Sequence, residues 1–247
     1  MKKLITFLFL IGTLQGFSQA NFNRIGIGFN TGFSTAYTGL SYGDSPIIPG
    51  FRPVKGITTN KSQVFGGSLE YYFSPFINAG IEYNNVTLKD GTDKHNRAFI
   101  SKLNSIEVRG SVALGQFIDF SYSPVLYNLR NVNASLGLGF ISGTNNVADF
   151  GSGTFPSRQH PNDFGKSEFN GVLSLPLSIS YFVNFYNIYD EPTVVLGVNY
   201  KINYTFSDEI DGYNDSASIF ENNSTDVFTT LSISLKYLFG PKGLYYR

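Results

Sequence analysis

The 247-residue chain contains no cysteine. This absence excludes disulfides, thiolate metal sites and a lipid-modified N-terminal cysteine. Charge of either sign is not in excess either, since 18 Lys and Arg residues balance 18 Asp and Glu residues. No cluster of basic residues stands out, so charge gives no reason to expect a nucleic-acid partner. The chemistry of this protein must therefore come from something other than thiols or a basic surface.

Long apolar runs are missing after the N-terminus. Lys2 and Lys3 precede an apolar stretch over 4–14, and Ser18 and Ala20 place small residues at the −3 and −1 positions of a cleavage site. This pattern predicts a secretory signal peptide over 1–20 and one mature domain over 21–247. The apolar stretch is too short for a membrane helix, and no later run reaches about 18 residues. Cleavage removes two lysines and no acids, which leaves 16 basic and 18 acidic residues, a net charge of −2.

The chain is rich in aromatic residues, with 24 Phe and 16 Tyr, and its apolar residues recur with a period of two. The clearest alternation covers 68–84. One face carries Leu69, Tyr71, Phe73, Ile77, Ala79, Ile81 and Tyr83. The other carries Ser68, Glu70, Tyr72, Asn78, Gly80, Glu82 and Asn84. With the short Ser74-Pro75 turn between its halves, this stretch predicts an antiparallel hairpin that has one apolar and one polar face.

The same alternation recurs along the chain and predicts eight strands. Besides the two strands of the hairpin, they cover 24–30, 105–114, 132–140, 173–181, 194–203 and 230–239. Long connections over 38–61, 87–98, 142–167 and 207–225 alternate with short ones. We therefore expect an all-β fold, an eight-stranded antiparallel up-and-down transmembrane β-barrel with lipid outside, a polar interior and both termini in the periplasm. A ten-stranded barrel is the alternative if strands extend into 115–128, and Pro176, in mid-strand, predicts a bulge.

Six charged residues have the parity of the polar face. They are Glu70, Glu82, Glu107, Arg109, Lys201 and Lys236. A barrel of eight strands is only wide enough for side chains to fill it, and charges buried there must pair. We expect these three acids and three bases to form a structural plug of ion pairs in the lumen. The alternative is a gated path for ions.

The loops contain few residues that could carry chemistry. His95 and His160 both lie in expected outer loops, and no spacing fixes a nucleophile against either as a base. The stretch 207–218 partly matches a calcium-binding loop, but Ser207 and Ser218 replace its first and last ligands. We therefore expect no enzymatic activity, no catalytic residues, no bound metal and no cofactor.

Aromatic residues in the expected outer loops are candidates for contact with a partner. They are Tyr42, Phe51, Phe150, Phe155 and Phe164. Exposed rings among Gly and Asn suit surface adhesion or binding of an envelope protein, whereas rings that pack on one another would close the barrel mouth. Both interpretations remain open. The triplet Asp215-Ser216-Ala217 resembles a short O-glycosylation motif of bacterial envelope proteins.

The segments YYFSPF at the hairpin turn and LSISLKYLFGPKGL near the C-terminus resemble small outer-membrane β-barrel proteins of the Bacteroidota porin-like kind. The charged interior resembles that of the OmpA transmembrane domain and of OmpX. Leu235, Tyr237 and Phe239 look like the C-terminal signal that the barrel-assembly machinery reads. The resemblance implies an outer-membrane location, with outer-membrane lipid and that machinery as partners. It also implies a structural, adhesive or partner-binding role; the alternatives are a narrow porin-like channel for ions or small solutes, or a subunit of a secretion or gliding assembly like PorT-type relatives.

Overall fold

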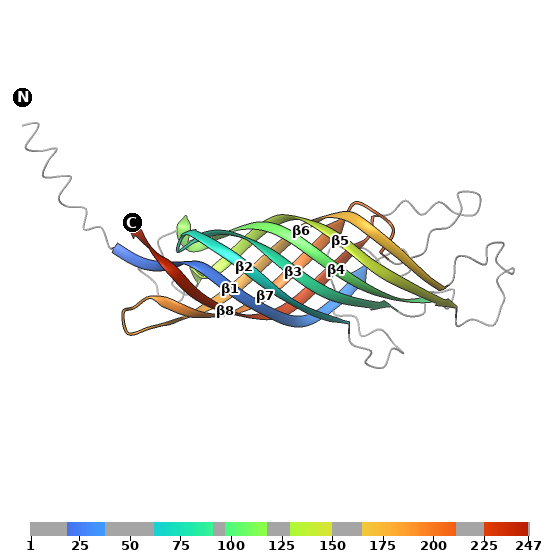
Figure 1. Cartoon of the computed structure of the whole chain (residues 1–247), viewed down its shortest axis with the longest axis horizontal. Coiled ribbons are helices and arrows are strands. Elements are labelled where there is room, and N and C mark those ends of the chain that lie inside the picture. The colour runs from blue at the N-terminus through green and yellow to red at the C-terminus, as the bar shows by residue number, and fades with distance from the viewer. Residues whose placement is uncertain are drawn as a thin grey trace, which may run out of the picture.

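A closed β-barrel accounts for nearly all of the residues that the computed structural model describes, which are 19–37, 62–90, 97–117, 129–149, 165–210 and 225–246. Its strands are β1 (Gln19–Tyr37), β2 (Gln63–Ser74), β3 (Ile77–Asp90), β4 (Arg97–Ala113), β5 (Val132–Asp149), β6 (Gly165–Tyr186), β7 (Pro192–Thr205) and β8 (Val227–Tyr246). Each strand pairs antiparallel with the next, and β8 closes the barrel on β1 (Figure 1). The predicted eight-stranded antiparallel up-and-down barrel is confirmed.

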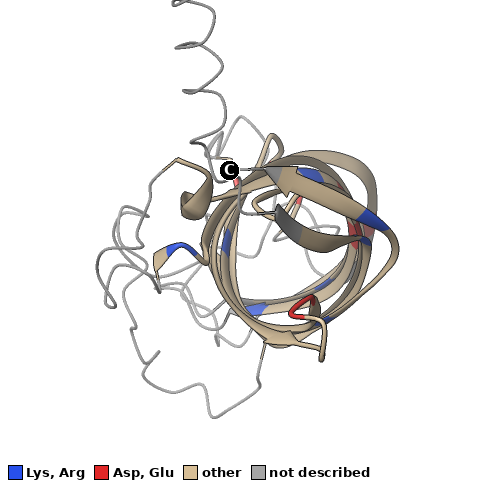
Figure 2. Ribbon diagram, turned by 90° about the vertical axis from the view of Figure 1, so that its left-hand side faces the viewer, with Lys and Arg blue, Asp and Glu red and all other residues tan. Residues whose placement is uncertain are grey.

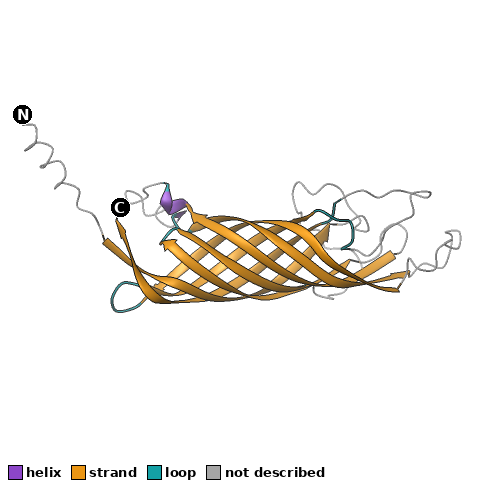
Figure 3. Cartoon of the chain, turned by 45° about the horizontal axis from the view of Figure 1, so that its top comes forward, coloured by secondary structure: helices purple, strands orange, loops and turns teal. Residues whose placement is uncertain are grey.

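The two ends of the barrel differ. One end, called here the turn end, carries the start of β1, the end of β8 and the short turns at 75–76 and 187–191. The 3-10 helix η1 (Leu114–Gln116) also lies there (Figure 3). The opposite end, called the loop end, is where β1, β3, β5 and β7 finish. No helix among the described residues is long and apolar enough to cross a membrane.

Large apolar side chains cover the outside of the barrel wall. Those more than half exposed in its middle include Ile81, Ile106, Val108, Leu138, Ile179, Ile233 and Leu235. Pairs of aromatic rings lie toward both ends, with Tyr71–Phe73 and Tyr237–Phe239 near the turn end and Tyr204–Phe206 near the loop end. An apolar band between aromatic girdles is the surface that lipid covers in a transmembrane barrel.

Several strands are longer than the alternation predicts. The expected loops over 87–98 and 142–167 are wrong at both ends, because β3 continues to Asp90, β4 begins at Arg97, β5 continues to Asp149 and β6 begins at Gly165. The last strand also continues past the expected end at 239, to Tyr246. In each case the ladder of paired backbone groups continues although the apolar outer face does not, and backbone pairing decides where a strand ends.

The expected bulge at Pro176 is wrong. The register between β5 and β6 is the same on both sides of Pro176, and β7 pairs with it through Asn203. The shift lies instead between Ile141 and Gly143, where the facing stretch of β6 contains Gly171 with φ of 80°. A positive φ is open to glycine, whereas the missing N–H of proline costs only a ladder contact.

Candidate functional site

The six charged residues predicted for the lumen all point into the barrel. They come from five strands: Glu70 from β2, Glu82 from β3, Glu107 and Arg109 from β4, Lys201 from β7 and Lys236 from β8. Their side chains are between 1% and 11% exposed. Seen from the turn end, charged residues lie on several sides of the ring of strands (Figure 2). A site of this kind can form only when the sheet closes, because its members are distant in sequence.

Ion pairs connect all six residues into one chain, called here the lumen network. Lys236 Nζ lies 2.8 Å from Glu70 Oε1, and Arg109 joins Glu70 at 2.6 Å to Glu82 at 2.9 Å. Lys201 Nζ then joins Glu82 Oε1 at 2.8 Å to Glu107 Oε2 at 2.7 Å. Acids and bases alternate along the chain, so the network is neutral as a whole. This is the arrangement that buried charges need in a narrow interior.

Lys201 is the residue of the network that contacts two carboxylates lying directly opposite each other. Glu82 and Glu107 lie directly opposite each other on β3 and β4, where two like charges repel. The Lys201 ammonium reaches across the lumen from β7 and contacts one oxygen of each carboxylate. Asn30 and Asn84 donate further hydrogen bonds to Glu82 at 3.1 and 2.9 Å. One cation thus holds together two carboxylates that would otherwise push their strands apart.

Gly80 makes room for the contact between Arg109 and Glu70. Gly80 on β3 lies between Glu70 on β2 and Arg109 on β4, at the same level of the sheet. Because Gly80 has no side chain, Arg109 passes over β3 to reach Glu70 on the far side. A Cβ at this position would meet the Leu69 carbonyl oxygen and would lie 2.9 Å from Glu70 Cα.

We expect Gly80→Ala to lower the free energy of unfolding by about 1–3 kcal/mol, because the added methyl overpacks the lumen and displaces Arg109 from Glu70. Urea titration of the folded barrel in micelles measures this change. Gly110→Ala is the matched control, since a Cβ there meets nothing within 4 Å. Equal stability of the two variants would contradict the role given to Gly80.

Little free space remains around the lumen network. A void of about 20 Å³ lies beside Glu82, Arg109 and Lys201, which is room for about one water molecule. Toward the turn end, the Lys236 ammonium lies 4.2 Å from the centre of the Phe182 ring, and the Tyr72 hydroxyl donates to Glu70 at 2.9 Å. The middle of the barrel is therefore filled by side chains.

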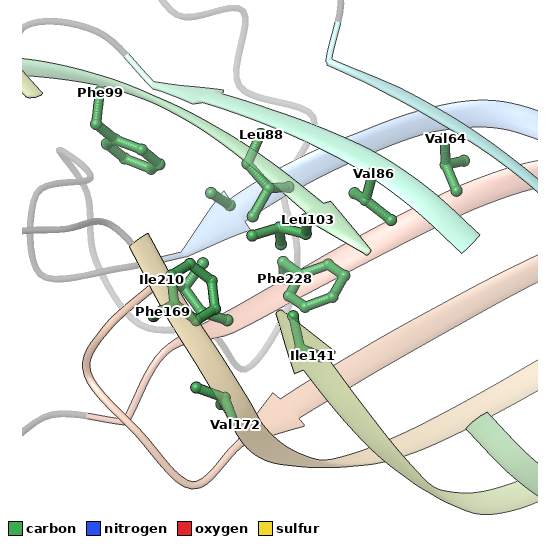
Figure 4. Packing of buried hydrophobic residues seen from close by; sticks show 11 residues of the cluster. Val64, Val86, Leu88, Phe99, Leu103, Ile141, Phe169, Val172, Ile210 and Phe228 are labelled. Carbon is green, nitrogen blue, oxygen red and sulfur yellow. The ribbon is translucent and has the colours of Figure 1, made fainter. Parts of the chain in front are cut away.

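Toward the loop end the interior becomes apolar. A cluster of buried side chains, called here the apolar cap, fills the lumen there (Figure 4). Its members are Ala36, Val64, Val86, Leu88, Phe99, Leu103, Ile141, Phe169, Val172, Ile210 and Phe228. The expectation of a polar interior is therefore wrong at this end of the barrel.

At the same level of the barrel, the outer face becomes polar on β3 and β4. On β3, the outward parity of Tyr83 continues with the exposed Asn85, whereas the inward parity of Glu82 continues with Val86. On β4, Lys102 is exposed outside and Leu103 is buried inside. A polar exterior around an apolar centre is the pattern of a barrel in water. On β3 and β4 the polar and apolar faces are therefore exchanged relative to the middle of the barrel, whereas Phe65 of β2, paired with Asn85, stays exposed on the outside.

A segment after β7 completes the apolar cap. Ile210 is fully buried in it, and its backbone N–H donates to Asp226 Oδ2 at 2.9 Å. Ser101 Oγ donates to the Ile210 carbonyl at 2.6 Å, and Asn145 Nδ2 donates to the Glu209 carbonyl at 2.5 Å. Side chains from β4 and β5 thus anchor the backbone at 209–210, and the Ile210 side chain lies buried in the apolar cap.

At the turn end, a second ion pair lies outside the expected lipid band. Lys242 of β8 donates to Glu191 Oε2, as does Asn187 Nδ2 at 3.1 Å. The hydrogen bond from Lys242, followed by that from Asn187, lowers the pKa of the Glu191 carboxyl. Asn23 Nδ2 of β1 also donates to the Pro192 carbonyl at 3.2 Å. These contacts tie the end of β8 to the 187–191 turn and the start of β1 to the first residue of β7.

The candidate contact residues of the outer loops lie outside the described residues. These are Tyr42, Phe51, Phe150, Phe155 and Phe164. The same holds for His95, His160 and the 215–217 triplet. Among the residues that are described, no group of three His, Cys, Asp or Glu side chains could hold a metal ion. The apolar cap is the part of the interior that the sequence interpretation missed, although Val86 and Leu88 alternate with Thr87 and Lys89 and so carried the signal.

No family model and no curated protein matches the chain. Among solved structures, it is similar to Neisserial surface protein A, with 16% identity and a TM-score of 0.41 over 87% of this chain and 97% of that one. It is also similar to the attachment invasion locus protein Ail of Yersinia pestis in complex with the heparin analogue sucrose octasulfate, with 11% identity, a TM-score of 0.44 and coverage of 88% and 99%. CarO of Acinetobacter baumannii shares 9% identity, with a TM-score of 0.43 and coverage of 85% and 97%.

Proposed function

We propose that this chain is a non-enzymatic outer-membrane β-barrel that holds its loops in place for structural, adhesive or partner-binding contacts outside the lipid. The observation that carries the proposal is the exchange of polar and apolar faces at the loop end, where Val86 and Leu103 are buried and Asn85 and Lys102 are exposed. Such a segment has its own dry centre and does not need lipid to stay folded. It forms a rigid base for the loops that follow.

The proposed location is the outer membrane, with both termini in the periplasm. The closed barrel with an apolar outer face supports it, as does the signal peptide predicted over 1–20. Short turns lie at the end that carries the termini, which is the periplasmic end in single-chain outer-membrane barrels. Outer-membrane lipid and the barrel-assembly machinery are the partners that this location implies.

A narrow channel for ions or small solutes is the second candidate, and the charged lumen is the feature that favours it. The apolar cap and the filled space around the lumen network argue against it, because an ion crossing them would have to lose its water. Liposome swelling separates the two candidates. We expect no uptake of small sugars or amino acids by vesicles that contain the folded barrel, under conditions where a general porin gives rapid uptake.

A photo-reactive residue at position 146 tests the proposed contacts. Asn146 is exposed on β5 at the loop end, whereas Ile179 on β6 is 63% exposed in the apolar band. In intact cells we expect cross-links from position 146 to an envelope or surface protein and only lipid adducts from position 179. Mass spectrometry identifies both kinds of adduct. A stoichiometric partner at 146 would favour membership of a secretion or gliding assembly, whereas protein adducts at neither position would contradict partner binding.

A further inference from the structure

A cavity of about 460 Å³ opens at the turn end of the barrel. The start of β1 contributes Phe22 and Asn23 to its wall, and the end of β8 contributes Tyr245. This volume falls within the range of roughly 300–1,000 Å³ that is usual for small-molecule sites. Unlike the lumen network beneath it, the cavity is large enough for a ligand.

Aromatic rings form the inner end of the cavity. Tyr72 and Phe182 line it, and both face the lumen network on their other side. The Tyr72 hydroxyl donates a hydrogen bond to Glu70, and the Lys236 ammonium lies 4.2 Å from the centre of the Phe182 ring. The charges are therefore already paired behind these rings, and the rings present apolar surface to the cavity.

Asparagine amides line the walls and keep hydrogen-bonding capacity. Asn23 and Asn133 use Nδ2 for backbone carbonyls, at 3.2 and 2.9 Å, which leaves Oδ1 of each as an acceptor for a ligand. Asn78 accepts from Ser111 through Oδ1 at 2.5 Å, which leaves its Nδ2 as a donor. The walls thus offer hydrogen-bond donors and acceptors together.

The mouth carries one charge of each sign. Arg130 and Asp190 both line it, together with Tyr186 and Tyr189. Arg130 Nη2 reaches toward the Tyr186 hydroxyl at 3.5 Å. With one cation and one anion, the charged part of the lining has no net charge. An anionic ligand would gain no net attraction from this lining and would lose its hydration on entering, so the lining favours a neutral ligand.

We propose that this cavity binds a neutral saccharide of one or two rings. Hydroxyl groups both donate and accept, which matches the mixed amide walls, and the C–H face of a sugar ring can pack on Tyr72 and Phe182. A purely apolar ligand would leave the amides without partners, which costs affinity. The site is independent of the outer loops, because its lining belongs to the turn end.

Ligand-observed NMR on the full mature chain in lipid nanodiscs tests this proposal. Nanodiscs avoid maltoside and glucoside detergents, whose sugar headgroups would compete for the site. The probes are N,N′-diacetylchitobiose and maltose as neutral sugars, with and without an acetamido group, and sialic acid as a charged one. We expect saturable binding of a neutral sugar and at least tenfold weaker binding of sialic acid. Preference between the first two probes identifies the saccharide class.

Asn133→Leu should weaken that binding about tenfold, the loss of roughly one hydrogen bond. Asn146→Leu is the matched control, since it makes the same exchange on β5 at the other end of the barrel. Tyr189→Ala at the exposed mouth gives a second variant that leaves the barrel wall intact, and it should also weaken binding. Absence of saturable binding, or unchanged binding in both cavity variants, would overturn the proposal.

Discussion

Lys201→Met is expected to lower the free energy of unfolding by about 3–5 kcal/mol, among the largest effects of any single change in this barrel. The substitution removes the one cation that contacts both Glu82 and Glu107, which lie opposite each other on neighbouring strands. Glu82 would keep its ion pair with Arg109, but Glu107 would lose its ion pair with Lys201 and face the Glu82 carboxylate across the two strands. Urea titration in micelles, followed by tyrosine fluorescence and by the gel shift of the unfolded chain, measures the loss.

Lys102→Met is the matched control for this prediction. Lys102 is exposed on the outer face of β4, so the same exchange there should change stability by less than about 0.5 kcal/mol. Adding Glu107→Gln to Lys201→Met should restore part of the loss, because it removes the carboxylate whose ion pair with Lys201 is lost. If Lys201→Met unfolded at the same urea concentration as the natural chain, the ion pairs would contribute nothing to stability.

The charged interior could be predicted because its cause is local. In a strand the side chains alternate, so the parity of Glu70 or Lys201 follows from the few residues on either side. A polar face with both acids and bases must then be enclosed and paired. The partners could not be predicted, since the contact of Lys236 with Glu70 depends on how far the sheet is sheared when β8 closes on β1. That shear is a property of the whole sheet and has no signature in any one strand.

The predicted ends of the strands were wrong for a related reason. The sequence interpretation ended each strand where the apolar outer face ended, as at Tyr83, because it assumed that lipid covers the whole strand. The chain instead continues the same strand with its faces exchanged, so Asn85 and Val86 keep the alternation with opposite character. The period of two persisted in the sequence, and only its interpretation was wrong. The change of solvent from lipid to water reverses which face must be apolar.

The role of a single glycine also could not be predicted from its own strand. A glycine inside a strand usually weakens the strand, yet the missing side chain of Gly80 lets Arg109 reach Glu70. That role appears only when β2, β3 and β4 are placed side by side. Likewise, Pro176 was expected to force a bulge, but a ladder contact is omitted there instead.

Val86→Asn and Asn85→Val form a pair of adjacent substitutions that locates the end of the lipid. Val86 is 1% exposed in the apolar cap, so the asparagine would lose apolar burial and would place an amide in a dry centre. We expect a loss of about 3–5 kcal/mol in the free energy of unfolding, measured by urea titration as above. Asn85 is exposed and donates to Asn104 at 2.8 Å, so Asn85→Val should cost only the hydrogen bond, about 1 kcal/mol.

Only the second result would change if lipid reached this level of the barrel. A valine at position 85 would then face acyl chains and stabilise the fold, whereas an asparagine at position 86 would still enter the apolar cap and destabilise it. Brominated lipids give an independent measure, because they quench only tyrosines in contact with acyl chains. Tyr83 should be quenched and a tyrosine introduced by Asn85→Tyr should not, since the exchange of faces falls between these two positions and fixes how much of the barrel stands in water.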